Sequence, residues 1–314
     1  MRRMTHRERA ITALNCGVPD RVPHFELEYQ ISDETHGAAF LREEDLDGLT
    51  QKEIDYKLEK NANLMAQVFT DLDWSIIPLQ VPQRADILIP TARHLRRLLG
   101  DSVLISSHGD GTFPIPDGEQ MYEFAYRIAD EPEEVHAEAE RLATEAVERN
   151  KRLFAEGVEC FHLCSDYCYN SGPFLSPAMF REFIAPYLAR VIDGIREMGG
   201  YAIKHTDGNI MPILDQLLSC RPHALHSLDP MAGVDIANVK KIAREKEVAI
   251  CGNVNCALMM TGTEEEIVQS ALYALRHGKP DGGYIYCSSN CIFKGLEPAR
   301  YELIRKVWLE NRDY

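Results

Sequence analysis

Side chains of the types that bind metal ions stand at the ends of several short apolar runs in this sequence of 314 residues. The run "YAIKH" ends at His205, "ALHSL" leads to Asp229, and "EVAICG" contains Cys251. The segment "GYIYCSSNCIF" places two thiols, Cys287 and Cys291, four positions apart. Zinc takes about four ligands from cysteine, histidine and carboxylate side chains, and catalytic sites leave one position open. We therefore predict a zinc site with the ligands His205, Asp229, Cys251 and Cys291.

Each of these residues also has a purely structural interpretation. A buried cysteine is often a small hydrophobic side chain, and His205 could be a hydrogen-bonded histidine at a strand end. Asp229 precedes Pro230, a setting in which aspartate is favourable in any turn. The nine cysteines are an odd number without regular spacing, which does not indicate a secreted disulfide framework. On spacing alone, a disulfide, a metal site and two inert thiols all remain open for Cys287 and Cys291.

The charge of the predicted site limits its chemistry. Two thiolates and a neutral histidine neutralise Zn²⁺, and Asp229 adds a further negative charge. Such a sulfur-rich, anionic zinc is a weaker Lewis acid than a site with three histidines. The predicted site therefore favours transfer of a group from a bound oxygen or sulfur atom over hydrolysis.

Eight short apolar runs are the candidate strands that would position these ligands. Several are rich in β-branched and aromatic residues, as fully buried parallel strands are. Because helical patterns separate them, a chain of this length favours a closed (β/α)₈ barrel over an open sheet. The eight runs are "RVPHFELE", 74–79, 102–107, 158–164, 201–205, 224–228, 247–252 and 283–288.

Capping signals mark several of the helices between these runs. The pairs Thr5–Glu8 and Thr263–Glu266 have the spacing of a capping box. Ser176 fits the N-cap of another helix, in which Pro186 predicts a kink or a break. We predict one (β/α)₈ domain over residues 1–314, with an N-terminal helical extension. Since active sites of such barrels lie where the strands end, the candidate ligands of the last four strands should converge.

Composition argues against several classes of partner. A net charge of −15 and a pI near 5.2 disfavour nucleic-acid binding, which needs clustered lysine and arginine. The N-terminal "MRRMTHRER" lacks the apolar core of a signal peptide, and no run of about 18 apolar residues indicates a membrane span. We therefore expect a cytoplasmic protein that binds neither nucleic acid nor a membrane.

Longer stretches of the chain resemble a known family. They are "TALNCGVPDRVPHFE", "SGPFLSPAMFREFIAPYLARVIDGIREMGG", "IKHTDGNIMPIL", "LDPMAGVDI", "CGNVN" and "GLEPARYELI". Together they resemble the uroporphyrinogen decarboxylase superfamily over nearly the whole chain. The resemblance implies a (β/α)₈ barrel and two candidate activities, tetrapyrrole decarboxylation and zinc-dependent methyl exchange with corrinoid proteins.

One segment favours the methyltransferase branch of this superfamily. The decarboxylases carry an arginine-containing "MRQAGR"-like segment after "RVP", which binds the carboxylates of the porphyrinogen. Here the corresponding segment is "HFELEYQISDE", which is acidic and contains no arginine. An acidic rim would repel a substrate with many carboxylates, so the resemblance argues against porphyrinogen decarboxylation.

The methyltransferase branch also carries a pattern of zinc ligands. Its members use a His-x-Cys at strand five and a cysteine after the last strand, which His205 and Cys291 match. Asp207 stands where the first cysteine of that pattern would be. Cys251 and Asp229 supply further ligands, in an order that resembles methyltransferases acting on phenyl methyl ethers. Whether Asp207 or Asp229 is the carboxylate ligand stays open.

The resemblance implies a zinc-dependent methyltransferase that moves methyl from a small methylated substrate, such as a phenyl methyl ether, to cobalt(I) of a corrinoid. We expect the corrinoid on a separate partner protein, because the chain has no "DxHxxG"-type segment and its eight strands use up the length. Glu26, Asp166 and Tyr167 are candidates for orienting the substrate or protonating the leaving phenolate.

Three alternatives remain on the same barrel. One is a metal-free decarboxylase or lyase acting on a small acid, with Asp166 or Asp207 as its acid. A second is a corrinoid methyltransferase that methylates a thiol. The third is a barrel without catalysis that only binds a ligand or a corrinoid protein. Tight zinc would argue against the first, and turnover would argue against the third.

Overall fold

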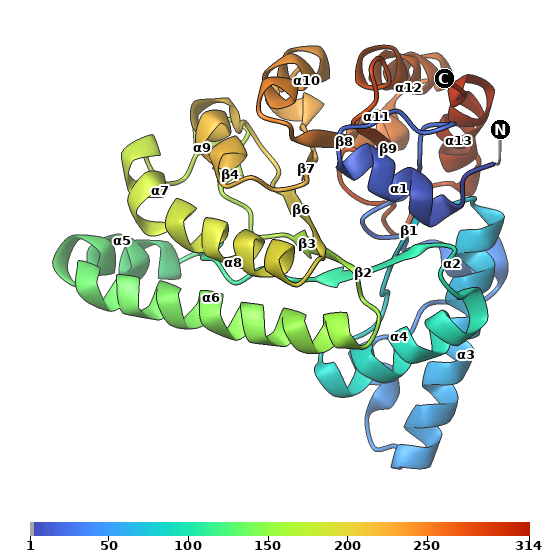
Figure 1. Cartoon of the computed structure of the whole chain (residues 1–314), viewed down its shortest axis with the longest axis horizontal. Helices are drawn as coiled ribbons and strands as arrows, with labels where there is room; N and C mark the ends of the chain where they lie inside the picture. The colour runs from blue at the N-terminus through green and yellow to red at the C-terminus, as the bar shows by residue number, and fades with distance from the viewer. Residues whose placement is uncertain (1–2) are drawn as a thin grey trace.

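The computed structural model describes residues 3–314 and contains one sheet of seven parallel strands (Figure 1). The strand order is β1-β2-β3-β6-β7-β8-β9, so strands that are neighbours in the sheet also follow one another along the chain. A short antiparallel pair, β4 with β5, lies between β3 and β6 in sequence. The strands are β1 Ile76–Pro78, β2 Leu104–His108, β3 Cys160–Leu163, β4 Cys168–Tyr169, β5 Gly172–Pro173, β6 Tyr201–His205, β7 Ala224–His226, β8 Ala249–Val254 and β9 Tyr284–Ser288.

The first of the eight predicted runs contacts both edges of this sheet. At the β9 edge, the backbone N–H of Tyr286 donates to the carbonyl of Pro23, and that of Phe25 donates to the carbonyl of Tyr286. At the β1 edge, the backbone N–H of Ser75 donates to the carbonyl of His24 at 2.8 Å. The run forms isolated bridges rather than a continuous ladder. Its position between the two edges agrees with the closed barrel that the sequence predicts.

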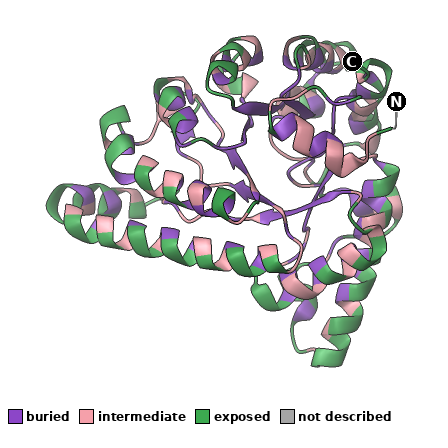
Figure 2. Ribbon diagram, viewed as in Figure 1, coloured by how far each residue is buried: buried purple, intermediate pink, exposed green. Residues whose placement is uncertain are grey.

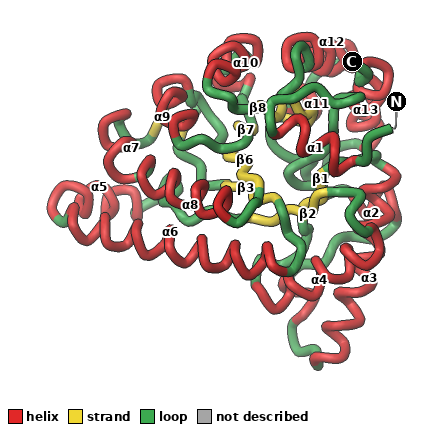
Figure 3. Tube along the Cα trace, in the orientation of Figure 1, coloured by secondary structure: helices red, strands yellow, loops and turns green. Residues whose placement is uncertain are grey.

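Helices surround the sheet, and Figure 3 shows the short strands at the centre of the molecule. No helix within residues 3–314 is long and apolar enough to cross a membrane. Three short 3₁₀ turns span Glu43–Leu46, Met211–Ile213 and Pro230–Ala232. The α-helices are α1 His6–Leu14, α2 Ser32–His36, α3 Gln51–Asp71, α4 Ala85–Leu99, α5 Gln120–Asp130, α6 Pro132–Ala155, α7 Pro177–Phe183, α8 Ala185–Glu197, α9 Leu214–Ser219, α10 Ile236–Glu245, α11 Cys256–Thr261, α12 Glu264–Gly278 and α13 Pro298–Asn311.

The helix boundaries follow the capping signals in the sequence. Both predicted capping boxes are present, at the starts of α1 and α12. Ser176 caps α7, and its Oγ accepts from the backbone N–H of Met179 at 3.2 Å. The interruption expected near Pro186 lies at Ile184, between α7 and α8. Pro186 then occupies the first turn of α8, where its missing N–H removes no helical hydrogen bond.

The strands are buried (Figure 2). Successive side chains of a strand point to opposite faces of the sheet. In the first run, the ring of His24 packs 4.9 Å from that of Trp308 of α13, on the outer face. The next residue, Phe25, points the other way and lies 5.4 Å from His162 and 5.8 Å from His226, ring centre to ring centre. The inner face of the sheet therefore carries histidines that the helices do not cover.

Candidate active site

Three polar side chains meet at the carboxyl ends of β3 and β6. His205 is the last residue of β6, Asp207 follows two positions later, and Asp166 lies in the loop after β3. His205 Nε2 lies 3.8 Å from Oδ1 of Asp166 and 3.8 Å from Oδ1 of Asp207. Ligand atoms of the three residues all lie within 4.8 Å of one another, which no other group of three or more His, Cys, Asp or Glu achieves in residues 3–314. We call these three residues the acid–histidine cluster.

Asp207 is the most tightly held member of this cluster. Its backbone N–H donates to Oδ1 of Asp166 at 2.9 Å, and Ser227, after β7, donates from Oγ to Asp207 Oδ1 at 2.6 Å. Asn290, after β9, donates from Nδ2 to Asp207 Oδ2. Burial raises the pKa of Asp207 to about 6, the Ser227 hydrogen bond opposes this, and the charges of Asp166 and Asp229 raise it further. A cation between the carboxylates would relieve this repulsion.

A buried lysine holds the loop that carries Asp166. Lys204 is completely buried, and its Nζ donates to Oδ2 of Asp110 at 3.0 Å. The same Nζ donates to the carbonyls of Leu163 and Ser165 at 3.0 and 2.8 Å. Breaking a buried ion pair leaves an uncompensated charge and is strongly destabilising. This network therefore ties β6 to the loops after β2 and β3 and fixes the position of Asp166.

The other two predicted catalytic residues lie outside the cluster. The Tyr167 hydroxyl is hydrogen-bonded to Oγ1 of Thr112 at 2.5 Å, and the tyrosine is buried. Glu26 is completely buried and accepts from the backbone N–H and the hydroxyl of Ser288. Its Oε1 has no hydrogen-bond partner in the described chain. Burial raises the pKa of Glu26 to about 8, so the folded protein holds this carboxyl in its neutral form at pH 7.

Of the four predicted zinc ligands, the structure brings His205 into the cluster and leaves the other three outside it. Asp229 accepts from the backbone N–H of Met231 at 2.8 Å and so caps the short turn after β7. Cys291 is half-buried in the loop after β9. Burial and the charge of Glu28 raise the pKa of the Cys291 thiol to about 12. Asp207 contributes to the same shift, so Cys291 lies within the electrostatic reach of the cluster.

Cys251 lies inside a strand rather than at its end. The sequence pattern placed a strand at 247–252 with Cys251 at its exit, whereas β8 continues to Val254. The Cys251 side chain has no exposed surface. Burial and the neighbouring Cys160 raise its pKa well above the ordinary value. The assignment of Cys251 as a zinc ligand therefore stays a prediction, made for a residue that lies inside β8 and not at its end.

Four histidines line the inner face of neighbouring strands, near the cluster. They are His108 of β2, His162 of β3, His205 of β6 and His226 of β7. His205 Nδ1 lies 2.7 Å from His226 Nδ1. Sequence reasoning did not single out His162 or His226. The sequence did contain a signal for them, because each histidine lies within an apolar run that predicts a buried strand. These runs are "CFHL" and "ALH".

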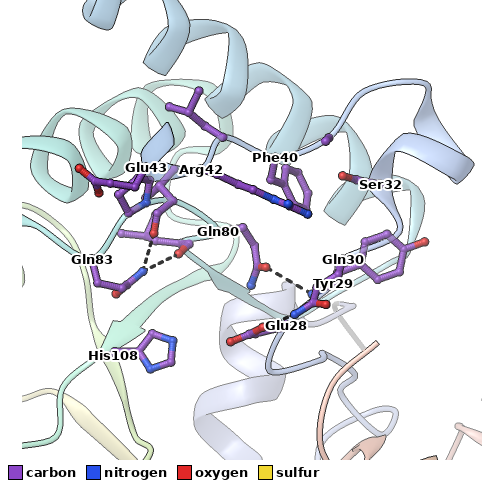
Figure 4. Close-up of a pocket in the computed structure, with 15 residues that line it drawn as sticks. Glu28, Tyr29, Gln30, Ser32, Phe40, Arg42, Glu43, Gln80, Gln83 and His108 are labelled. Atoms are coloured by element: carbon purple, nitrogen blue, oxygen red, sulfur yellow. Dashed lines mark hydrogen bonds between the residues drawn. The ribbon is translucent and has the colours of Figure 1, made fainter. Parts of the chain in front are cut away.

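A cavity of about 510 Å³ opens beside His108, between residues 28–43 and the loop after β1 (Figure 4). Figure 4 shows Glu28 and His108 on one side of this cavity, with Phe40 and Arg42 across from them. A second cavity of about 310 Å³ shares Gln83 and His108 with the first. Neither ring nitrogen of His108 has a hydrogen-bond partner among the described residues. This histidine is therefore free to bind a ligand in either cavity.

Glu28 supplies the negative charge of the larger cavity that has no ion-pair partner among the described residues. Its Oε2 accepts from Nε2 of Gln30 at 2.8 Å, and no lysine, arginine or histidine of residues 3–314 forms an ion pair with it. Burial lowers the pKa of His108, and the Glu28 carboxylate opposes that shift. The same carboxylate raises the pKa of both Cys164 and Cys291. Glu28 thus faces the strand ends from the cavity side.

A family model and two curated proteins match long stretches of the chain. The model of the family described as "Uroporphyrinogen decarboxylase (URO-D)" matches residues 57–306, well over half of the chain. A uroporphyrinogen decarboxylase of Anaeromyxobacter dehalogenans is 25% identical over 226 residues, which cover 70% of this chain and 62% of that protein. A second, from an Anaeromyxobacter species, is 26% identical over 156 residues, 50% of this chain and 42% of that protein. The matched region thus spans less than two thirds of either relative.

Among solved structures, a methyltransferase from Methanosarcina mazei superposes with a TM-score of 0.76. The superposition covers 98% of this chain and 99% of that one, at 15% sequence identity. At this low identity, the superposition shows a shared fold alone.

Proposed function

Because the chain belongs to the uroporphyrinogen decarboxylase family, we propose that it is a zinc-dependent methyltransferase built on the closed (β/α)₈ barrel of that family. Its substrate is a small methylated molecule, a phenyl methyl ether, and its acceptor is cobalt(I) of a corrinoid on a separate protein. The observation that carries this proposal is the acid–histidine cluster at the carboxyl ends of β3 and β6. A second argument is the likeness in fold to the methyltransferase from Methanosarcina mazei.

The acid–histidine cluster fits a small divalent cation. Zinc bonds to nitrogen and oxygen are about 2 Å long, so two ligand atoms of a tetrahedral site lie about 3.3 Å apart. The two separations of 3.8 Å from His205 Nε2 are only slightly larger. Two carboxylates and one imidazole are ordinary zinc donors. We propose Asp166, His205 and Asp207 as ligands, and Cys291, in the loop after β9 and outside the cluster, as the candidate for a fourth.

This ligand set competes with the one that the sequence predicts. The predicted set of His205, Asp229, Cys251 and Cys291 shares His205 and Cys291 with the proposed one. The two sets differ in whether the carboxylates come from the loops after β3 and β6 or from the turn after β7. They also differ in Cys251, which would have to leave the interior of β8 to bind the same ion.

In the proposed reaction the bond between methyl and oxygen breaks. The methyl group passes to cobalt, and the leaving oxygen keeps the electron pair of the bond and takes up a proton. A bound zinc ion supplies positive charge that stabilises the developing oxyanion. Of the three predicted catalytic residues, Asp166 lies in the cluster as a proposed ligand, whereas Glu26 is hydrogen-bonded to Ser288 and Tyr167 to Thr112. His108 faces the cavity and can donate a hydrogen bond to the substrate.

The cavity of Figure 4 has the size and lining of a small-molecule site. Its volume of about 510 Å³ falls within the usual range for ligand pockets. Phe40 offers an apolar wall for an aromatic ring, and Glu28 and His108 offer polar contacts. The charged residues that line it are Glu28, Arg42 and Glu43 besides His108, and Glu43 is paired with Arg84 outside. One arginine is a poor match for a substrate with many carboxylates.

A second candidate function is metal-free decarboxylation of a small acid. One argument for it is that both curated relatives are uroporphyrinogen decarboxylases. Another is the raised pKa of Asp207, which suits a carboxyl that gives up a proton. In that case Asp166 and Asp207 would act directly on the substrate. The two proposals differ in whether the purified protein retains zinc.

The proposal is tested by metal analysis followed by a coupled assay. Protein purified without added metal should hold about one zinc per chain. With a methoxyphenol and a corrinoid protein in the cobalt(I) state, it should yield methylated corrinoid and free phenol in equal amounts. His205→Ala should lose both products, whereas Cys287→Ser, which changes a buried thiol outside the cluster, should keep them.

Three results would contradict the proposal. Phenol formed without any corrinoid protein would exclude cobalt as the acceptor. Equal activity from protein stripped of zinc would exclude the metal. Conversion of uroporphyrinogen to coproporphyrinogen above background would select the decarboxylase branch instead.

A further inference from the structure

His205 has a second polar contact, on the side away from the carboxylates. Its Nδ1 lies 2.7 Å from Nδ1 of His226, the residue opposite it in the β6–β7 register. Both side chains are buried, with 4% and 1% of their surface exposed. Each ring therefore lies within hydrogen-bond distance of the other and is shielded from water.

At this separation one Nδ1 must donate and the other must accept. A neutral imidazole has one N–H and one bare nitrogen. For His205 Nε2 to bind a cation it must be bare, so the ring proton must sit on Nδ1 and be donated to His226. His226 then carries its own proton on Nε2, an atom with no partner among residues 3–314.

We propose that His226 is a positioning residue, which holds His205 in the tautomer that presents a bare Nε2 to the cation site. The inference rests on the proposed function, since it assigns His226 a role toward the proposed metal ion. Ligating histidines usually donate their other ring N–H to a fixed acceptor, and loss of that acceptor lowers metal affinity about 10- to 100-fold. Here the acceptor is a second histidine from the adjacent strand. No carboxylate or carbonyl takes that place for His205 among the described residues.

His162 provides a matched control on the neighbouring strand. Like His226 it is 1% exposed, contacts Phe25 and has a buried Nε2 without a partner. It differs in forming no hydrogen bond with His205. Replacing either histidine by leucine therefore removes the same buried ring against the same phenylalanine, and one of the two replacements also removes the acceptor.

The test compares wild type, His226→Leu, His226→Asn and His162→Leu by titrating the metal-free proteins with Zn²⁺ and Co²⁺. His226→Leu should bind both ions about 10- to 100-fold more weakly. His226→Asn, whose side-chain oxygen can accept in place of Nδ1, should recover most of the affinity. His162→Leu should bind as wild type does. Unchanged affinity in His226→Leu, or an equal loss in His162→Leu, would overturn the proposal.

Proton NMR of the metal-free protein tests the pair independently of any metal. A low-field imidazole N–H proton should be present in wild type and His162→Leu and absent from His226→Leu. Its persistence in His226→Leu would overturn the proposal even if affinity fell. Wild-type protein that shows this proton but binds neither ion would contradict the proposed function and the role of the pair, although the hydrogen bond exists.

Discussion

The β6–β7 side and the β8–β9 side of the sheet offer metal-binding residue types in very different surroundings. On the first side, His205 ends its strand and meets two carboxylates that loops bring to it. On the second, Cys251 and Cys287 lie within β8 and β9 and have no exposed surface. Hydrogen-bonding groups surround the first set, and apolar residues surround the second.

The difference shows that the point at which a strand ends decides which groups a side chain can meet. A parallel strand rises about 3.3 Å per residue. Cys251 lies three residues before the end of β8 at Val254, which puts it about 10 Å below the strand end. His205 is the last residue of β6 and lies at that end. The register nevertheless puts Cys251 in line with His226, because Ala224 pairs with Ala249 and Leu225 pairs with Ile250. The two sides therefore differ in how far the strand continues past the metal-binding residue.

The strongest test of this comparison is to replace single residues of the acid–histidine cluster. His205→Ala or Asp207→Asn should each lower zinc affinity by on the order of 100-fold, because each removes a proposed ligand and not a supporting contact. Asn has the shape of Asp but lacks the negative charge that balances the cation. Zinc per chain after dialysis, and titration of the metal-free protein, would measure the loss. Full retention of zinc in both variants would show that the cluster is not the metal site.

Two carboxyls with raised pKa values give a second contrast between the sides. Asp207 has a pKa of about 6 at the strand ends, and Glu26 has a pKa of about 8 in a sealed position beside β9. Because the pKa of Glu26 is raised by burial, the folded chain holds a proton that the unfolded chain releases near pH 4.5. Its contribution to stability is therefore complete below that pH and is lost as the pH rises toward 8.

We expect the free energy of unfolding of the wild type to fall by on the order of 1 kcal/mol between pH 6.5 and 7.5 through this group. Glu26→Gln should lack this part of the slope, since an amide does not titrate. Asp207 titrates mostly below this window, so Asp207→Asn is the control and should keep the slope. Chemical denaturation at several pH values would measure it. An identical slope in Glu26→Gln would show that Glu26 is not the buried acid.

The two candidate ligand sets make opposite predictions for Cys251. Cys251→Ser should destabilise the fold by about 1 to 3 kcal/mol, because it buries a hydroxyl in an apolar interior. It should leave zinc content unchanged, as should Cys287→Ser one strand away. Cys291→Ser should instead lower zinc affinity and leave stability nearly unchanged. Equal loss of zinc from Cys251→Ser and Cys291→Ser would restore the ligand set predicted from the sequence.

Much of the fold follows from the sequence because its signals are local. Seven of the eight apolar runs become strands of the parallel sheet, and both capping boxes form. The run "RVPHFELE" contacts both sheet edges but pairs through isolated bridges. Pro23 has no N–H to donate to a ladder. On the β1 side, the backbone contact of the run comes from Ser75, which precedes that strand.

The sequence indicates which residue types stand near the strand ends, but not which of them lie close together in space. His205 and Asp166 were identified because they follow strand-like runs, and Asp207 was left open beside Asp229. What the sequence does not contain is the depth of each side chain, which depends on where β8 ends and how strands stagger. The pairing of His205 with His226 depends on the same register, since it joins residues 21 positions apart.

The smallest expected effect concerns the cavity lined by Glu28 and His108. Glu28→Gln keeps a hydrogen-bond acceptor but removes the charge, and a charged acceptor contributes about 1 kcal/mol more than a neutral one. A methoxyphenol that donates its hydroxyl to Glu28 should therefore bind about fivefold more weakly to the variant. Titration of the protein with the phenol, without corrinoid, would measure the change. Glu43→Gln is the matched control, because Glu43 lines the same cavity but is paired with Arg84.

The two variants also separate a specific contact from a general effect of charge, because each removes one negative charge from the cavity. Equal weakening in both would show that the cavity responds to net charge alone, and unchanged binding in Glu28→Gln would place the phenol elsewhere.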